Sequence, residues 1–308
     1  MNKRINKNEK LYFGHYSVAF MDLLGQQDFL RNLHSVPNPD DSQEMDATKE
    51  HLKNTYGAVT TMRRLFNTSF EAFSKRNTDL SKLTTDQKKK FKELTNNPIK
   101  FQSFSDSVVI FMPLRTDIAK LPMRGIFGIL GAAATVFICS LAAGHPIRGG
   151  IDVGIGMEIA ENEIYGPALS RAYALESRIA NYPRIVVGNE LLRYLEITRD
   201  HEPKDTTASI AKKTAQDCIK CLAEDDDGYL FVDYLGKFYR HMFGDVIDVS
   251  VIQKAYINVI KFSEKYQKEK KGKLAFRYTL LRNYFENRLP LWEDLFPTEQ
   301  NDKNKTGT

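Results

Sequence analysis

Residues 99–112 read IKFQSFSDSVVIFM, and this stretch decides the fold class. Most of its residues favour extended strands, but Ser105 and Asp106 in the middle belong to the residue types that turns prefer. The stretch therefore predicts two short strands joined as a hairpin, with Asp106 at the tip between Phe104 and Val108. The rest of the fold is inferred from the elements on either side of this hairpin.

Strand and helix patterns alternate on both sides of the hairpin. Strands are predicted over residues 16–24, 147–156 and 184–187, helices over residues 47–73, 126–143, 164–180, 251–270 and 276–288, and a second hairpin over residues 229–234 and 237–242. This order predicts an α+β fold of the ferredoxin-like or palm type, with a central, mostly antiparallel sheet flanked by helices. No dinucleotide motif and no Walker A motif follows a strand, which argues against the Rossmann and P-loop classes.

Composition changes along the chain predict its organisation. We expect an N-terminal tail at residues 1–14, one main domain at residues 15–245, a C-terminal helical segment at residues 246–297 and a disordered tail at residues 298–308. Polar and charged stretches predict insertions in the main domain near residues 35–98 and 195–227.

Charge and cysteine content narrow the class of protein. The net charge of +5 suits an anionic small molecule but is too small to predict a nucleic-acid surface. Three cysteines predict a reducing compartment, and hence a cytoplasmic protein, rather than a disulfide scaffold. Cys218 and Cys221 form a single C-x-x-C without further zinc ligands at fitting spacing, so we expect an exposed pair of thiols on a helix.

One segment, residues 126–143 (IFGILGAAATVFICSLAA), carries no charge over about the length that spans a bilayer. It is rich in glycine and alanine, and a strand pattern follows almost at once. A core helix packed closely under a sheet explains this composition as well as a membrane span does. We therefore expect a buried helix and no stable membrane insertion.

Two aspartates lie where the predicted strands end. Asp22 follows the apolar run of residues 16–21, and Asp106 occupies the hairpin tip. Each alone could be a cap or turn residue, but a carboxylate in an apolar run is costly to bury unless something pairs with it. If the first strand lies beside the hairpin, both acids emerge at one edge of the sheet. Two carboxylates there suit Mg²⁺ or Mn²⁺ together with substrate phosphates.

Four motifs in this sequence resemble those of class III nucleotidyl cyclases, in the family's order. They are F-M-D-L-L-G at residues 20–25, F-S-D-S-V-V-I at residues 104–110, I-R-G-G-I-D-V-G-I-G at residues 147–156, and Y-G-P-A-L-S-R-A-Y-A-L-E-S at residues 165–177. The resemblance covers about residues 16–187. Each motif alone has low specificity, and the four in order are moderately specific.

The resemblance implies a two-metal mechanism that closes a nucleoside triphosphate into a 3′,5′-cyclic monophosphate and releases pyrophosphate. Asp22 and Asp106 would bind two Mn²⁺ or Mg²⁺ ions, the carbonyl of Leu23 would add a ligand, and Phe20 would line the pocket. The family builds each active site from two subunits, so a chain with one catalytic domain implies a homodimer with composite sites.

The sequence departs from the family in its phosphate-handling helix. Ser170 stands where the family has asparagine, and Ala174 stands where it has the arginine that stabilises the transition state. Arg171 and Arg178 lie three residues before and four after Ala174, and on a continuous helix either could reach the same phosphate. Arg148 is expected to be structural or to orient the triphosphate.

Base selection is implied by two further positions. Adenylate and guanylate cyclases of this class carry characteristic pairs where this chain has Gln102 and Glu163, and these two residues match neither purine pair. This pattern resembles the pyrimidine cyclases of Pycsar anti-phage defence, which make cyclic CMP or cyclic UMP. The alternatives are an adenylate cyclase, or a degenerate cyclase that senses nucleotide without turnover.

Overall fold

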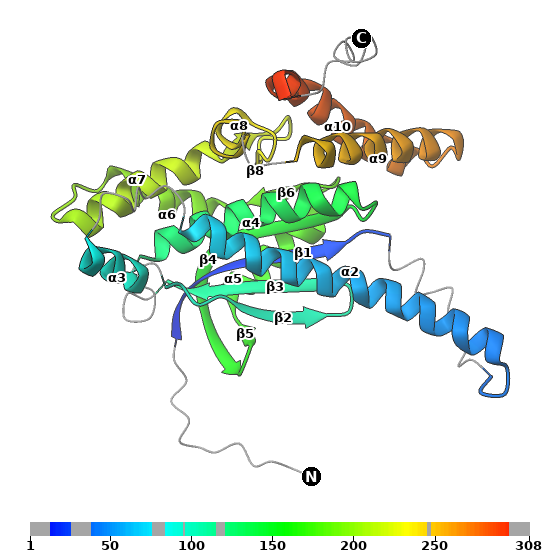
Figure 1. Ribbon diagram of the computed structural model, residues 1–308, viewed down its shortest axis with the longest axis horizontal. Helices are drawn as coiled ribbons and strands as arrows, with labels where there is room; N and C mark the ends of the chain where they lie inside the picture. The colour runs from blue at the N-terminus through cyan, green and yellow to red at the C-terminus, as the bar shows by residue number, and fades with distance from the viewer. Residues whose placement is uncertain are drawn as a thin grey trace, which may run out of the picture.

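The computed structural model describes residues 13–25, 38–75, 84–94, 96–114, 121–244 and 248–295 (Figure 1). The tail expected at residues 298–308 and the first twelve residues of the tail expected at residues 1–14 lie outside the described residues. The first strand begins at Phe13, inside the range expected as the N-terminal tail.

Four strands and two helices form the centre of the fold. The strands are β1 (Phe13–Leu23), β2 (Lys100–Phe104), β3 (Ser107–Pro113) and β4 (Ile147–Ala160), with α2 (Ser42–Ser74) between β1 and β2 and α4 (Pro122–Ala142) between β3 and β4. The spatial order is β2-β3-β1-β4, and every neighbouring pair is antiparallel. This is the ferredoxin-like arrangement, so the predicted fold class is confirmed.

Further strands extend the sheet beyond β4. They are β6 (Ile185–Val187), parallel to β4, then β8 (Leu230–Val232) and β7 (Leu222–Glu224), while β5 (Glu163–Tyr165) pairs with the far end of β4. The prediction that residues 229–234 form a hairpin with residues 237–242 is therefore wrong. β8 pairs with the preceding β7, and the following residues form helix α8 (Lys237–Phe243), because Phe238, Tyr239 and Met242 recur at helical spacing and pack on the core.

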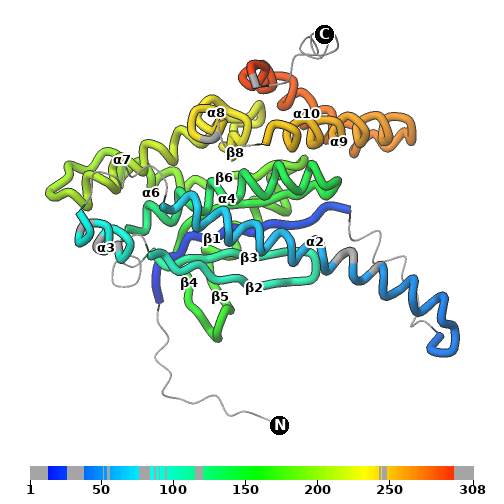
Figure 2. Tube along the Cα trace, viewed as in Figure 1, coloured from blue at the N-terminus to red at the C-terminus, as the bar shows by residue number. Residues whose placement is uncertain are grey.

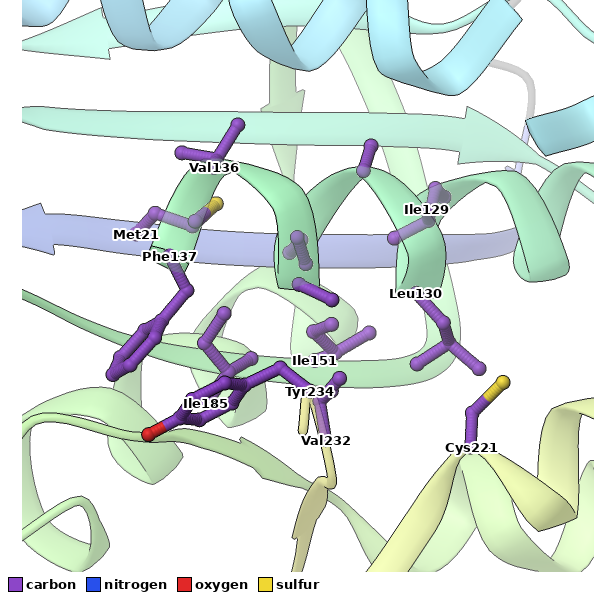
Figure 3. Packing of buried hydrophobic residues seen from close by; sticks show 14 of the residues in the cluster. Met21, Ile129, Leu130, Val136, Phe137, Ile151, Ile185, Cys221, Val232 and Tyr234 are labelled. Atoms are coloured by element: carbon purple, nitrogen blue, oxygen red, sulfur yellow. The ribbon is translucent and has the colours of Figure 1, made fainter. Parts of the chain in front are cut away.

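One face of the sheet carries the main core. Ala19, Met21 and Leu23 of β1 point to this face, and α4 packs against it with most of its side chains buried (Figure 3). α2 packs beside α4 on the same face and crosses in front of the sheet in Figure 1. The range expected as an insertion, residues 35–98, thus holds α2 together with the short helix α3 (Thr85–Leu94).

Glycines explain the composition of α4. Gly128 and Gly131 meet α2, where added β-carbons would lie 2.9 Å from the Phe70 ring and 2.0 Å from the Phe73 ring. Among the described residues α4 is the one helix long and apolar enough to cross a membrane, but 78% of its apolar window is buried inside the protein. The small residues thus admit the aromatic side chains of α2, as expected for a buried core helix.

The opposite face of the sheet is covered by a shorter helix. Tyr16, Val18 and Phe20 of β1 point to this face and pack with α5 (Pro167–Ala174) in a second apolar cluster. The predicted continuous helix over residues 164–180 is wrong at both ends. Residues 163–165 form β5, and α5 gives way to a π-helical turn, Leu175–Ile179.

The remaining helices complete the core on the α4 side. They are α6 (Asn189–Asp200), α7 (Thr206–Lys220), α9 (Val249–Lys268), α10 (Gly272–Arg288) and a short 3-10 helix (Leu289–Leu295). The helices predicted at residues 251–270 and 276–288 correspond to α9 and α10. α9 lies along α4 in Figures 1 and 2, and Asn258 of α9 donates to the carbonyl oxygens of Leu141 and Ala142 at 2.9 Å and 3.0 Å.

Cys218 and Cys221 are buried, so the expectation of an exposed thiol pair is wrong. They lie at the C-terminal end of α7, which packs on α4 and turns its apolar side, including Ala215 and Cys218, into the main core. Cys221 appears close to Leu130 of α4 in Figure 3. Burial raises the pKa of both thiols, which keeps them protonated near neutral pH.

Candidate functional site

Three polar side chains form a row across the second face of the sheet. The strand register places Asp22 of β1 opposite Ser107 of β3 on one side and opposite Arg148 of β4 on the other. Ser107 donates a 2.6 Å hydrogen bond to Asp22 Oδ1, whereas Arg148 Nη2 lies 4.0 Å from Asp22 Oδ2. Asp22 is thus fixed by a serine and faces a guanidinium that it does not contact closely.

Asp106 lies beside this row, at the tip of the β2–β3 hairpin. The preceding Ser105 has a φ of 48°, a left-handed conformation that makes the turn tight. The backbone N–H of Leu23 donates to the Asp106 carbonyl at 3.3 Å, which ties the end of β1 to the hairpin tip. The structure therefore brings Asp22, Leu23 and Asp106 together, as the motifs imply.

Electrostatics also link the two aspartates. Burial is the largest cause that raises the pKa of Asp22, and the charge of Asp106 raises it further. The Ser107 hydrogen bond and the charge of Arg148 act in the opposite direction. Two carboxylates that repel each other in a partly buried position gain most from a shared cation.

The donor set fits a hard divalent cation. In the part of the chain that the structure describes, no group of three or more histidine, cysteine, aspartate or glutamate side chains could hold a metal by itself. Two neighbouring carboxylates match the usual Mg²⁺ site, in which water and substrate oxygens supply the other ligands. Asp22 and Asp106 would hold the ions, and the ions would supply charge neutralisation on the phosphates and a lower pKa of the attacking hydroxyl.

A third carboxylate, that of Glu176, is close to Arg148, and the sequence did not single it out. Glu176, in the π-helical turn, is 3% exposed, and its Oε1 lies 2.6 Å from Arg148 Nη2. Burial raises the pKa of Glu176, and the ion pair with Arg148 opposes that shift. Residues 174–180 read A-L-E-S-R-I-A, so Glu176 is an acid close to apolar residues. The argument used for Asp22, that a buried carboxylate needs a partner, would therefore also have identified Glu176.

Gly150 explains how the π-helical turn comes so close to β4. A β-carbon at Gly150 would lie 2.3 Å from the Ala172 carbonyl oxygen and 2.6 Å from Leu175 Cβ. The helix backbone therefore rests directly on the strand, a close approach that a glycine in a strand permits. Single π-helical turns inside helices occur often at functional sites.

The two arginines proposed for phosphate contact have different surroundings. Arg171 Nε lies 3.2 Å from Asp152 Oδ2, and its Nη2 donates to the Val153 carbonyl at 2.8 Å. Asp152 is buried and also accepts the backbone N–H of Leu191 in the first turn of α6 at 2.8 Å. Arg171 is thus engaged at the junction of β4 and α6.

Arg178 is exposed, and no partner for its guanidinium is seen among the described residues. The π-helical turn between Ala174 and Arg178 has more residues per turn than an α-helix, so Arg171 and Arg178 do not share one face as a continuous α-helix would require. Of the two, Arg178 has no ion pair among the described residues, whereas Arg171 is paired with Asp152 and also lines a pocket beside α5.

A pocket of about 630 Å³ opens next to the row, between β1, the hairpin tip and α5. Four aromatic side chains line it: Phe20, Phe104, Tyr165 and Tyr173. Phe20 and Tyr173 meet edge to face with ring centroids 5.2 Å apart. Ser170 also lines this pocket, and Phe20 lies two residues before Asp22 on the same strand face.

The two predicted base-selecting residues lie near the same pocket. Gln102 Oε1 accepts the backbone N–H of Ile164 at 3.1 Å, which places β2 beside β5 and next to Glu163. Glu163 is exposed at the start of β5. Phe104 and Tyr165, which line the pocket, follow Gln102 and Glu163 by two residues in their strands.

Comparisons with known proteins give little beyond this geometry. No protein-family model and no curated protein matches the chain. A search of solved structures finds a bacterial light-regulated adenylyl cyclase, 9% identical in sequence, with 79% of this chain and 99% of that chain covered and a TM-score of 0.37. The fold assignment therefore depends on strand order and register, and the function depends on the residues of the site.

Proposed function

We propose that this protein is a nucleotidyl cyclase that converts a nucleoside triphosphate into its 3′,5′-cyclic monophosphate and pyrophosphate. The observation that carries the proposal is the meeting of Asp22 and Asp106 at one edge of a ferredoxin-like sheet, beside an aromatic pocket. The four motifs in family order support the same activity.

Each residue of the site has a part in this reaction. Asp22 and Asp106 bind the two cations, Mn²⁺ or Mg²⁺, and the Leu23 carbonyl is the additional ligand. Ser107 holds the Asp22 carboxylate in its ionised, ligand-ready orientation through its 2.6 Å hydrogen bond. Catalysis then consists mainly of aligning the 3′-hydroxyl with the α-phosphorus and neutralising phosphate charge.

Arg178 is our candidate for the cation that contacts the phosphates. It is exposed and has no ion pair among the described residues, whereas Arg171 is held by Asp152 and Val153. Ser170 on the pocket wall is the candidate for the position where the family has asparagine. Arg148 is paired with Glu176, so we assign it a structural role and not a contact with the phosphates.

We further propose that the substrate is a pyrimidine nucleotide, CTP or UTP. The support is the pair Gln102 and Glu163, which lie together near the aromatic pocket and match neither purine pair. Aromatic walls stack any base, so discrimination must come from polar groups such as these two. A cytoplasmic role in bacterial anti-phage signalling rests on the resemblance to the Pycsar cyclases alone.

The active form is proposed to be a homodimer with two composite sites. In such a dimer Asp22 and Asp106 come from one subunit and Arg178 from the other. The exposed aromatic side chains that line the pocket, Phe104, Tyr165 and Tyr173, support an interface at this site.

One experiment tests the activity and the base together. The purified protein is incubated with Mn²⁺ and each of the four ribonucleoside triphosphates, and cyclic products are separated by chromatography. We expect product from CTP or UTP alone, and none from Asp22→Asn or Asp106→Asn, with Asp226→Asn at an exposed turn as the matched control.

Other outcomes of this assay decide between the alternatives. Product from ATP alone would contradict the pyrimidine proposal but keep the cyclase. Saturable nucleotide binding without any turnover would favour the sensor, which the replacements at Ser170 and Ala174 make the second candidate. Full activity in either aspartate variant would contradict the two-metal site.

A further inference from the structure

Asp22 has a competitor for any cation that it binds. The β1–β4 register puts Arg148 directly opposite Asp22 on the same face of the sheet, with 4.0 Å between Nη2 and Oδ2. A guanidinium about 1 Å closer would form a full ion pair with this carboxylate. Such a pair would occupy the oxygen atoms that a divalent cation needs and would cancel their charge.

Glu176 keeps the guanidinium from that position. Its carboxylate is 2.6 Å from the same Nη2 atom, and its side chain is 3% exposed whereas that of Asp22 is 16% exposed. A buried ion pair in such a place is strongly coupled, because neither member can be left alone without a large desolvation penalty. Arg148 therefore stays with Glu176 while Asp22 keeps its negative charge.

Two contacts of the π-helical turn fix Glu176 in this place. The backbone N–H of Glu176 would lie 2.9 Å from a β-carbon at Gly150, so the turn sits directly on β4. At the other end of the turn, the carbonyl of Ile179 accepts a 3.0 Å hydrogen bond from Nη2 of the buried Arg184. Arg184 is itself held by the carboxylates of Asp225 and Asp227. The carboxylate of Glu176 is thus on a turn that is held from both sides.

We propose that Glu176 is a positioning residue of the metal site: it holds and neutralises the guanidinium of Arg148, and so leaves the Asp22 carboxylate available for a divalent cation. This inference rests on the proposed metal site at Asp22 and Asp106. Glu176 itself touches neither the cation nor the substrate, and it acts through Arg148.

The test measures binding of Mn²⁺ alone, without nucleotide, by electron paramagnetic resonance or calorimetry. In Glu176→Gln the guanidinium of Arg148 loses its counter-charge and can pair with Asp22, so we expect the Kd for Mn²⁺ to rise roughly tenfold. In the double variant Glu176→Gln/Arg148→Met the competing charge is gone, and we expect Mn²⁺ affinity to return to within about twofold of the wild type. Glu190→Gln, which removes an exposed carboxylate at the start of α6, is the matched control and should bind Mn²⁺ unchanged.

A merely structural role of Glu176 gives a different pattern. The double variant would then bind Mn²⁺ as poorly as Glu176→Gln, or worse, and that result would overturn the proposal. Unchanged binding by Glu176→Gln would overturn it as well.

If Glu176→Gln does not fold, the Arg148→Gln variant tests the same proposal. It removes the competitor, so its folded fraction should bind Mn²⁺ at least as tightly as the wild type, and weaker binding overturns the proposal. If the wild type binds no Mn²⁺, the proposed metal site is wrong, and so is the proposed role of Glu176. If the wild type binds Mn²⁺ and Glu176→Gln binds it equally well, only the proposed role of Glu176 is wrong.

Discussion

At the scale of single residues, the site is built by strand register. Ser107, Asp22 and Arg148 are distant in sequence, and two register pairs bring them into one row. The sequence predicted the two aspartates, because an acid in an apolar run or at a hairpin tip is visible without a structure. It did not predict Glu176, whose partner depends on how the helix sits on β4.

The hydrogen bond from Ser107 should affect how Mn²⁺ binding depends on pH. It lowers the pKa of Asp22 against the larger effect of burial, since it stabilises the ionised carboxylate. Ser107→Ala removes that contribution, so the pKa of Asp22 should rise further. Cation binding needs the ionised form, and the acid limb of Mn²⁺ binding should therefore move to higher pH.

A titration of Mn²⁺ affinity against pH measures this shift. Ser103→Ala is a suitable control, because Ser103 pairs with Val108 on the other face of the hairpin. We expect no shift for Ser103→Ala. A Ser107→Ala limb that stays in place or moves to lower pH would show that the serine does not tune Asp22.

At the scale of elements, the sequence predicted the order of strands and helices well. Long apolar or periodic segments such as β1, α4, α9 and α10 carry their own signal. The errors fell on the short elements β7, β8 and α8, whose pairing is decided by tertiary contacts rather than by local pattern, and on the helix α6, which was not predicted. The π-helical turn was missed for the same reason, because it is associated with the close approach to Gly150 and not with a pattern in its own sequence.

The Gly150 contact predicts a large effect from a small side chain. Gly150→Val would place a β-carbon 2.3 Å from the Ala172 carbonyl, so the turn must move away from β4. We expect the free energy of unfolding to fall by about 1–3 kcal/mol and Mn²⁺-dependent turnover to drop, because Glu176 moves with the turn. Urea denaturation and the cyclase assay measure both effects.

A glycine without neighbours provides the control for this substitution. Gly57 lies in α2 with nothing within 4 Å of its absent β-carbon. Gly57→Ala should raise the free energy of unfolding by roughly 0.5–1 kcal/mol, because alanine loses less backbone entropy in a helix. Equal stability of Gly150→Val and the wild type would mean that the turn does not need its contact with β4.

At the scale of the whole molecule, the α+β architecture followed from the order of elements, whereas no sequence pattern could show how the chain meets a second copy. The proposed composite site can be tested by mixing two defective variants. Asp22→Asn and Arg178→Ala should each be nearly inactive as homodimers. In a mixed dimer one site carries both changes and the other carries neither.

Random exchange of subunits should therefore restore roughly a quarter of the wild-type rate in an equal mixture. The assay follows cyclic product after the two proteins have been mixed and allowed to exchange. An Asp106→Asn and Asp22→Asn mixture is the control and should stay inactive, because both changes fall in the same half of the site. No recovery in the first mixture, or full activity of Arg178→Ala alone, would contradict the assignment of Arg178 to the partner's site.

The row of Ser107, Asp22 and Arg148 also bears on how the chain folds. Side chains alternate between the two faces of a strand, so a slip of β1 by one residue would turn Asp22 into the apolar core and Phe20 away from its cluster. A buried, unpaired carboxylate would make that misaligned sheet unstable. Asp22 therefore also favours the correct strand alignment during folding, and a chain that has lost this acid should be more tolerant of misfolded, shifted pairings.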